Sequence, residues 1–376
     1  FFVQSRISRV NCKMKATSDN VAIVGRLYKE AFASRVPISC NLELTRRCNF
    51  RCPHCYASPH VGELQVDRAL HDIRQLSDLG CLYYTLTGGE AILHPDFEEI
   101  CLEIKRHIGV ITLFSNGFFL DEKLDFLKRI RPQAVDVTIY GSSDEAYEAF
   151  CGVHGGYKRV LANIKAALSV GLNITLKMFV TRDNYSDFPA VRQLAANLGL
   201  PFRFDSELFP TFGGDVSLIN QSISVEESLL MDLSSNNGNP ADWFDRGRRS
   251  SCDDPSIVSE WHSLQNLTCA GKVFRCKAGR SSMFVTSENM ARMCYMIPSI
   301  EYNLNEMTLK NAWAEFKKQI LLEENPESEC AKCLDREFCH VCPARLFHAN
   351  GKIDSIEGDS RCCAIMHAKR RIKSLS

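Results

Sequence analysis

The sequence predicts an α/β protein in which short parallel strands alternate with helices and a metal-stabilised region follows. Between about residues 38 and 210, six β-rich runs alternate with amphipathic helical stretches, which is the pattern of parallel β/α units. Beyond about residue 260, cysteines replace periodic elements, so bound metal rather than a large core is expected to stabilise that segment. Periodicity alone leaves open whether the strands form a partial barrel or an open doubly wound sheet.

The expected strands combine β-branched and aromatic residues with turn residues at their ends. They cover residues 41–45, 82–87, 110–114, 134–140, 173–180 and 202–207. The expected helices repeat apolar residues at helical spacing and cover residues 66–79, 95–108, 124–129, 157–170 and 188–198. Whether the sheet is a partial barrel or open, the active site is expected at the carboxyl ends of the strands.

Composition along the chain predicts four parts. Residues 1–37 carry no clear motif and form an N-terminal extension, and residues 38–230 form the β/α core. Residues 231–260 form a linker whose turn-forming residues cluster at 234–240, preceded by one short helix near 224–233. Residues 261–376 form the cysteine-rich domain.

The composition argues against several classes of partner. The 376 residues are 45% hydrophobic and 24% charged, with 45 Lys and Arg against 45 Asp and Glu. A balanced charge does not support a broad electrostatic contact with nucleic acid. The sequence shows neither a secretory signal nor a run of about 18 apolar residues. We therefore expect a cytoplasmic protein with no nucleic-acid or membrane partner, in which the 18 cysteines are reduced.

The first cysteine group follows the first expected strand with the spacing Cys-x3-Cys-x2-Cys, at Cys48, Cys52 and Cys55. Three thiolates on one tight loop can hold three irons of a cubane four-iron cluster. The fourth iron then lacks a protein ligand and is open to a chelating small molecule. The alternative is a structural zinc site, which normally has four protein ligands and would use His54 as the fourth.

This loop resembles the signature of the radical S-adenosylmethionine (SAM) superfamily, in which an aromatic residue lies beside the third cysteine, as Tyr56 does here. The resemblance implies a partial (β/α)6 barrel, a SAM-binding [4Fe-4S] cluster on the three cysteines, and SAM as cofactor. Gly88, Gly89 and Glu90 end the second strand, where the family binds the amino group of the methionyl moiety. Glycines allow close approach of a ligand, and a carboxylate pairs with an ammonium group.

Three more polar residues at or near strand ends are expected SAM contacts by the same resemblance, namely Ser115, Ser142 and Lys177. A turn, cap or surface role is the alternative for each of them. Arg203 and Asp205, in the last expected strand, are expected to form a buried ion pair instead.

A second field of cysteines occupies the C-terminal part. It comprises Cys269, Cys276, Cys294, Cys330, Cys333, Cys339, Cys342 and the neighbours Cys362 and Cys363. Two closed four-iron clusters need eight thiolates, and so would two all-cysteine zinc ribbons. Spacing alone leaves both readings open.

The order of these cysteines resembles a SPASM domain, the auxiliary-cluster extension of many radical SAM peptide-modifying enzymes. The resemblance assigns one cluster to Cys269, Cys276, Cys294 and Cys342, and a second to Cys330, Cys333, Cys339 and either Cys362 or Cys363. The gap between Cys339 and Cys342 is one residue shorter than usual, so the assignment of Cys342 as a ligand departs from the family pattern. Asn289 replaces the usual glycine, which is acceptable because Asn also adopts the left-handed conformation.

Tyr295 directly follows Cys294, where the related sulfatase-maturing enzymes carry an aspartate general base. The substitution argues against sulfatase maturation. Tyr295 is the candidate catalytic residue, and a packed aromatic side chain is the alternative.

The resemblance implies an enzyme that reductively cleaves SAM to a 5′-deoxyadenosyl radical, which then removes hydrogen from a substrate. The first expectation is modification of a ribosomally made peptide through a thioether or carbon–carbon crosslink or a related oxidation. The alternatives are biosynthesis of a cofactor or haem precursor and, outside enzymes, a zinc-stabilised binding module.

The expected partners follow from the same resemblance. They are a peptide substrate and a flavodoxin- or ferredoxin-type electron donor. Residues 1–37 are too few for a leader-binding domain, so we expect a separate leader-peptide-binding protein or recognition through residues 211–255.

Overall fold

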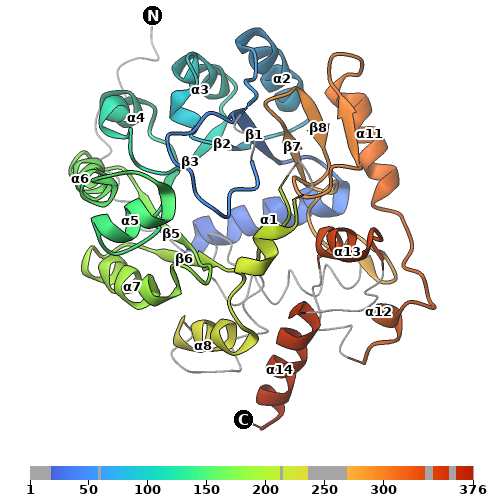
Figure 1. Ribbon diagram of the computed structural model, residues 1–376. Helices are drawn as coiled ribbons and strands as arrows, with labels where there is room; N and C mark the ends of the chain where they lie inside the picture. The colour runs from blue at the N-terminus through green and yellow to red at the C-terminus, as the bar shows by residue number, and fades with distance from the viewer. Residues whose placement is uncertain are drawn as a thin grey trace, which may run out of the picture.

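The computed structural model describes residues 18–57, 61–211, 215–235, 269–334, 342–354 and 361–375. Within these residues, a curved sheet forms the centre of the molecule and helices cover its outer face (Figure 1). Six strands lie parallel in the order β6-β5-β4-β3-β2-β1. Their bounds are β1 Ser39–Thr45, β2 Tyr83–Gly88, β3 Val110–Ser115, β4 Ala134–Thr138, β5 Ile174–Phe179 and β6 Phe202–Asp205.

Helices connect consecutive strands and pack on the outside of the sheet (Figure 1). They are α2 Val66–Asp78, α3 Phe97–Arg106, α4 Leu124–Ile130, α5 Asp144–Cys151, α6 Gly156–Ser169 and α7 Phe188–Asn197. Short 3-10 turns are η1 Ala91–Leu93, η2 Asp121–Lys123, η3 Tyr185–Asp187 and η4 Ser217–Gln221. Apolar residues at helical spacing, such as Ala69, Ile73 and Leu76 of α2, are fully buried against the strands.

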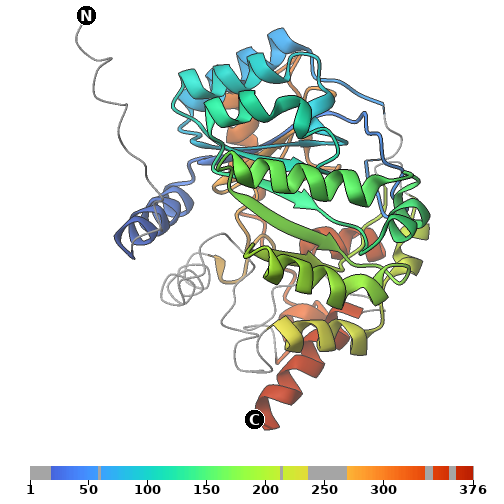
Figure 2. The ribbon, with the colours of Figure 1, turned by 90° about the vertical axis from the view of Figure 1, so that its left-hand side faces the viewer.

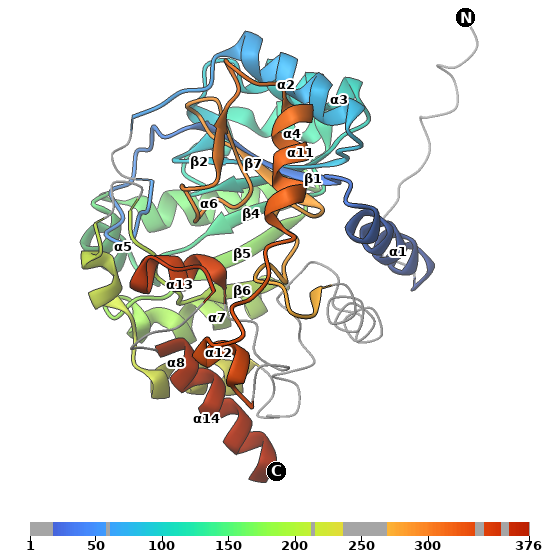
Figure 3. The ribbon, with the colours of Figure 1, turned by 90° about the vertical axis from the view of Figure 1, so that its right-hand side faces the viewer.

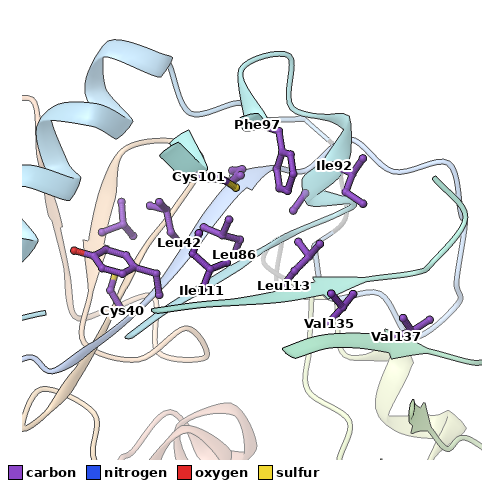
Figure 4. Close-up of a cluster of buried hydrophobic side chains, with 14 of the residues drawn as sticks. Cys40, Leu42, Leu86, Ile92, Phe97, Cys101, Ile111, Leu113, Val135 and Val137 are labelled. Carbon is purple, nitrogen blue, oxygen red and sulfur yellow. The ribbon is translucent and has the colours of Figure 1, made fainter. Parts of the chain in front are cut away.

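The main core lies between the sheet and these outer helices. Figure 4 shows Leu42, Leu86, Ile111 and Leu113 on the strands, close to Phe97 of α3. Alternate residues of each parallel strand point to this helix-covered face, and the residues between them point to the opposite, inner face. The inner face is the one available to a site at the centre of the curved sheet.

The cysteine-rich part extends the same sheet. Strand β7 (Ser282–Val285) pairs parallel with β1, and β8 (Met290–Arg292) and β9 (Glu301–Asn303) follow antiparallel. Helix α11 (Leu309–Gln319) lies beside this extension (Figure 3), with Phe316 5.4 Å from Tyr302 between ring centroids. The sheet therefore runs across the expected boundary between core and cysteine-rich domain, and most of the expected linker 231–260 lies outside the described residues.

The remaining helices are α8 (Val225–Ser235), α12 (Glu329–Lys332), α13 (Pro343–Asn350) and α14 (Arg361–Leu375). Helices α8 and α14 lie side by side (Figures 1 and 3), joined by an ion pair between Asp232 and Lys369. Arg361 Nη2 also donates to Ser228 Oγ across 2.7 Å. None of the helices in the described part of the chain combines the length and the apolar character needed to cross a membrane.

A helix in the N-terminal extension was not expected. Helix α1 (Ser18–Ser34) projects from one side of the sheet (Figure 2). Its Tyr28 stacks on Tyr83 at the start of β2 with ring centroids 5.0 Å apart, and its Phe32 is fully buried. The sequence analysis found no clear motif in residues 1–37 and did not predict this helix, because its aromatic residues contact partners far along the chain.

Candidate active site

Cys48, Cys52 and Cys55 lie on the loop that leaves the carboxyl end of β1. The loop turns tightly, because the backbone N–H of Cys55 donates to the carbonyl of Cys52 across 3.1 Å. The Cys48 thiol accepts hydrogen bonds from the backbone N–H of Phe50 at 3.4 Å and from Asn116 Nδ2 at 3.6 Å. Hydrogen bonds to sulfur are among the means by which proteins tune iron–sulfur clusters.

Burial favours the neutral form of these thiols. It raises the pKa of Cys48 to about 12 and holds the pKa of Cys55 above its ordinary value. The pKa of Cys52 lies well above its ordinary value, first because of a hydrogen bond with the thiol of Cys151 and then because of burial. A thiolate is the form that binds metal, so the positive charge of bound metal is what would draw off these protons.

The donors do not suit a single metal ion. No three His, Cys, Asp or Glu side chains in the described residues are arranged to hold one ion. A cubane cluster spreads its irons over separate corners, so its thiolates stand farther apart than the ligands of one zinc. The three thiols fit a cluster better than a mononuclear site.

His54, the alternative fourth zinc ligand, is a packing residue. Its ring stacks on Phe179 at 4.7 Å and lies 5.4 Å from Phe150 and 5.5 Å from Tyr140, measured between ring centroids. Burial lowers the pKa of His54 to about 4, so the imidazole is neutral at pH 7. This aromatic contact fixes the cysteine loop over the carboxyl end of β5.

Gly88 and Gly89 allow the end of β2 to approach the cysteine loop. A Cβ atom on Gly88 would lie 2.0 Å from the carbonyl oxygen of Thr45, and one on Gly89 would lie 2.4 Å from that of Arg47. The backbone N–H groups of Gly89 and Glu90 donate to these same two carbonyls at 2.7 and 2.8 Å. The glycines were expected to admit a ligand; the structure gives them a further reason, which is close contact between two backbones.

Glu90 is a fully buried carboxylate held by Ser115 and Asn116. Ser115 Oγ lies 3.0 and 3.1 Å from its two oxygens, and the backbone N–H of Asn116 donates to Oε2 across 2.7 Å. Burial raises the pKa of Glu90 to about 7, although these hydrogen bonds favour the ionised form. No Lys, Arg or His pairs with it among the residues that the structure describes. A bound ammonium group would supply that missing positive charge.

The other expected SAM contacts have partners within the protein. Ser142 donates from its backbone N–H to Asp187 Oδ1 across 2.9 Å, and its hydroxyl bonds the same oxygen. Lys177 Nζ lies 2.9 Å from Asp136 Oδ2. Of the expected SAM contacts, Glu90 and Ser115 therefore lie together. Ser142 and Lys177 instead bind the carboxylates of Asp187 and Asp136 at or near the ends of β4 and β5.

The expected ion pair between Arg203 and Asp205 was wrong in its partner. Arg203 Nη1 lies 3.7 Å from Asp136 Oδ2 on β4, whereas the exposed Asp205 accepts the backbone N–H groups of Ser206 and Glu207. The cause is strand register: Arg203 lies opposite Lys177, Lys177 lies opposite Thr138, and Asp136 lies two residues before Thr138 on the same face of the sheet.

Tyr56 and Tyr295 meet where the two cysteine regions approach each other. Their rings pack edge to face with centroids 4.7 Å apart, and Tyr295 also lies 4.2 Å from Phe284. The hydroxyl of Tyr295 lies 3.4 Å from Glu43 Oε1. Burial raises the pKa of both phenols, so both are neutral at pH 7. The expected catalytic residue is thus both packed and hydrogen-bonded beside the cysteine loop.

Glu43 and Arg46 are site residues that the sequence analysis missed. Glu43 is fully buried on β1 and accepts from Ser287 N at 2.9 Å, Ser287 Oγ at 2.8 Å and Arg46 Nε at 3.3 Å. Arg46 in turn binds both carboxylate oxygens of Glu288 at 3.0 Å. These bonds fix the turn between β7 and β8 to the cysteine loop. The bonds from Arg46 to Glu288 and from Ser287 to Glu43 each span more than 240 residues, so no local sequence pattern could have predicted them.

Part of the second cysteine field also comes together. Cys276 and Cys342 both act on Cys294 and, after burial as the main cause, help to raise its pKa to about 12. Cys276 likewise adds to the effect of burial on the pKa of Cys269. An electrostatic influence of this kind requires the thiols to lie near one another. The expected first auxiliary ligand set is therefore gathered in one region.

The expected second set is described only in part. Cys330 and Cys333 flank the short helix α12, and the backbone N–H of Cys333 donates to the carbonyl of Cys330 across 3.3 Å. Cys339 and the side chain of Cys362 lie outside the described residues, whereas Cys363 is half-buried on α14. Asn289 has φ 60°, which confirms the left-handed conformation expected where the SPASM pattern has glycine.

Comparison with known proteins agrees with this geometry. The family model described as the Radical SAM superfamily matches residues 42–195. The structure of Streptococcus suis SuiB bound to precursor peptide SuiA superposes with a TM-score of 0.65 at 14% identity, covering 94% of this chain and 83% of that one. This likeness concerns the fold and confirms the expected partial barrel.

Two relatives identified by sequence carry different activities in their names. The AdoMet-dependent heme synthase of Methanosarcina barkeri is 25% identical over 338 residues, which cover 85% of this chain and 94% of that protein. The sporulation killing factor maturation protein SkfB of Bacillus subtilis is 31% identical over 170 residues, covering 44% of this chain and 41% of that protein. The peptide-maturing relative thus matches less than half of this chain.

Proposed function

This chain belongs to the radical SAM superfamily, and we propose that it cleaves SAM reductively at a four-iron cluster held by Cys48, Cys52 and Cys55. Such a cluster, when bound, supplies the electron that converts SAM into methionine and a 5′-deoxyadenosyl radical. Glu90 would bind the methionyl ammonium group through a charge-assisted hydrogen bond. The chain's own task is to orient SAM and the substrate and to exclude water from the radical.

One observation carries this proposal: Asn116 connects the carboxylate to the cysteine loop. Its backbone N–H donates to Glu90 Oε2 across 2.7 Å, and its side-chain Nδ2 lies 3.6 Å from Cys48 Sγ and 2.8 Å from Asn49 Oδ1. A single residue therefore sets the position of the expected ammonium site relative to the expected cluster site. That is the geometry needed for a ligand whose amino group and reacting sulfonium must be placed together.

Two auxiliary clusters form the second part of the proposal. The neighbouring thiols of Cys276, Cys294 and Cys342, with Cys269 next to Cys276, support one closed cluster. Cys330, Cys333, Cys339 and one of Cys362 and Cys363 would hold the other. These residues would hold closed clusters, whose chemistry would be electron transfer to or from the substrate or an external flavodoxin- or ferredoxin-type donor.

We propose a ribosomally made peptide as the substrate, modified through a crosslink or a related oxidation. The peptide-maturing relative and the precursor-bound neighbour support this choice. A haem precursor is the second candidate, because the match to the Methanosarcina barkeri haem synthase covers 85% of this chain and 94% of that protein. A separate leader-binding protein is part of the peptide proposal only.

The cluster proposal is tested with anaerobically reconstituted protein and dithionite. We expect 5′-deoxyadenosine from the wild type, and none from a variant with Cys48, Cys52 and Cys55 all replaced by Ala, which should also lose about four irons. Cys101→Ala is the matched control, because Cys101 is fully buried in the core. Continued formation of 5′-deoxyadenosine by the triple variant would refute the proposal.

The substrate proposal is tested by co-expression with short reading frames encoded next to the gene. Mass spectrometry should detect a mass change in one encoded peptide that requires the three loop cysteines. If no peptide changes while the reconstituted protein converts a porphyrin precursor, the haem-precursor candidate replaces it.

A further inference from the structure

Three charged side chains from neighbouring strands share the inner face of the sheet. Asp136 of β4, Lys177 of β5 and Arg203 of β6 alternate with Val135, Val137 and Leu176, which are fully buried on the helix-covered face. Since successive strand residues point to opposite faces, the charged side chains point toward the centre of the curved sheet. Phe114 of β3, opposite Asp136 in register, lies beside them.

The charges within this group do not balance. One carboxylate oxygen, Asp136 Oδ2, faces both Lys177 Nζ at 2.9 Å and Arg203 Nη1 at 3.7 Å. Asp136 is 1% exposed, and its other oxygen, Oδ1, is buried without a hydrogen bond. The two cations, Lys177 and Arg203, therefore share the single carboxylate of Asp136 in a partly buried environment. Charges in such surroundings are normally paired, so the group has room for one further negative charge.

Both cations can be reached by a ligand and are held in place. The side chain of Lys177 is 20% exposed and that of Arg203 is 30% exposed. Lys177 Nζ lies 3.0 Å from the centroid of the Phe114 ring, which adds a cation–π contact. Burial lowers the pKa of Lys177 to about 8, although Asp136 opposes this, so the ammonium form still predominates at pH 7.

Arg203 has hydrogen-bond donors to spare. A guanidinium carries five N–H donors in a planar fork that matches a carboxylate. Its contact with Asp136 is too long for a good hydrogen bond. Within the described part of the chain, none of its N–H groups makes a hydrogen bond to another residue. An arginine with unused donors near a buried carboxylate is suited to bidentate recognition of an anionic ligand.

The methionyl carboxylate of SAM is not the anion that this site fits best. Glu90 follows β2, whereas Lys177 lies on β5, three strands away in the sheet order. Neighbouring strands are about 4.8 Å apart, so the separation along the sheet is roughly 14 Å. The ammonium and carboxylate groups of a methionyl moiety share one carbon atom. If Glu90 holds the ammonium group, this separation of the strands favours an anion supplied by a second molecule, and the test below includes SAM as the competing ligand.

We propose that Lys177 and Arg203 bind a carboxylate of the substrate from which hydrogen is removed, with Asp136 holding the two cations in place. This inference rests on the proposed function and deepens it by naming a chemical group that the substrate must carry. An aspartate, glutamate or C-terminal carboxylate of a peptide fits, and so does a propionate of a porphyrin. Lys177, expected from the sequence to contact SAM, is thereby assigned to the substrate.

The test separates substrate binding from SAM binding. The variants are Lys177→Met and Arg203→Met, with Lys177→Arg as the charge-conserving variant and the exposed Lys165→Met of α6 as the matched control. The first probe is coproporphyrin III, a tetracarboxylate, titrated by absorbance into the SAM-loaded protein. The second is the precursor peptide identified by co-expression, compared with versions in which Asp and Glu are replaced by Asn and Gln.

We expect the Met variants to weaken binding of one probe by about tenfold or more, the cost of losing a hydrogen bond to a charged group. Lys177→Arg should retain most of the binding, and Lys165→Met should bind as the wild type does. Loss of porphyrin binding identifies a porphyrin carboxylate. Loss of peptide binding, matched by the neutralised peptides, identifies a peptide carboxylate.

The proposal is overturned if both probes bind the Met variants and the wild type equally. It is also overturned if the Met variants bind both probes normally but need a higher SAM concentration for half-saturation. A wild type that forms no 5′-deoxyadenosine when loaded with iron and sulfide refutes the proposed function as well. Circular dichroism of each variant distinguishes a lost ligand contact from a lost fold.

Discussion

Tyr295 and Glu43 lie 252 positions apart in sequence, yet the phenol of Tyr295 lies within 3.4 Å of Glu43 Oε1. Tyr295 directly follows Cys294, and Glu43 lies on β1 just ahead of the first cysteine loop. One hydrogen bond therefore connects the region of the second cysteine field with the loop that carries the first. Together with the ion pair between Arg46 and Glu288, it makes the position of one region depend on the other.

Removing the carboxylate of Glu43 should destabilise the protein strongly. Glu43→Ala would leave the buried guanidinium of Arg46 and the N–H and hydroxyl of Ser287 without this partner. Removing one partner of a buried ion pair lowers the unfolding free energy by about 3–5 kcal/mol, because the other charge is left buried without a partner. Urea denaturation followed by circular dichroism measures this. Lys318→Ala is the control, because its pair with Glu315 is exposed and is worth about 0–1 kcal/mol. Equal losses in both variants would contradict the structural role of Glu43.

The buried carboxyl group of Asp72 should make stability depend on pH. Burial raises the pKa of Asp72 from 3.8 to about 7, against the opposing effect of Arg68. Folding therefore favours the protonated form, so this group's contribution to stability is complete below about pH 4 and is lost as pH rises toward 7. Asp72→Asn should remove that decline, and its unfolding free energy relative to wild type should rise across this range.

The matched control is Asp67→Asn, on the exposed first turn of the same helix. Its unfolding free energy should stay within about 0.5 kcal/mol of wild type, because its side chain is exposed. Parallel curves for Asp72→Asn and wild type between about pH 4 and pH 7 would show that Asp72 does not cause the pH dependence.

Loss of Cys294 should remove one auxiliary cluster. Cys276 and Cys342 are its neighbours, so replacing Cys294 with Ala opens a ligand position in a buried site. The reconstituted variant should contain about four irons fewer than wild type, with the corresponding loss of labile sulfide. Cys81→Ala, at a buried core cysteine of the β/α part, should keep the full content. Equal iron in wild type and the Cys294 variant would exclude this thiol as a ligand.

The β/α core was predictable because its signals are local. The six expected strands agree with β1 to β6 to within a few residues, since each apolar run is bounded by turn residues. The expected helices between them are likewise confirmed. Helix α5 was missed; it begins at a cap in which the backbone N–H of Ala146 donates to Ser143 Oγ across 3.2 Å.

The extension of the sheet was not predictable in the same way. Strands β7, β8 and β9 have only three or four residues each, and every residue of β7 is buried, so no alternation marks it. The site divides similarly. The cysteine spacing and Gly-Gly-Glu are short sequence motifs that can be recognised locally. The pairing of Arg203 with Asp136 instead depends on the register of two strand pairs, β4 with β5 and β5 with β6. The register between distant strands is a property of the folded sheet, and no local sequence pattern predicts it.

Replacing Gly89 with Ala should displace the cysteine loop. The new Cβ would lie 2.4 Å from the carbonyl oxygen of Arg47 and 2.5 Å from that of Arg46, and backbone atoms cannot yield as a side chain can. The hydrogen bond from Gly89 N to Thr45 O would lengthen, and the loop would move away from Glu90. Because the loop sets the thiol positions, we expect Gly89→Ala to lose iron from the first cluster and 5′-deoxyadenosine formation together. Gly171→Ala is the control, since its Cβ meets nothing within 4 Å and its φ of 82° costs about 1 kcal/mol of stability without touching the loop. Normal iron content and activity in Gly89→Ala would mean that the loop tolerates a shift larger than the structure allows.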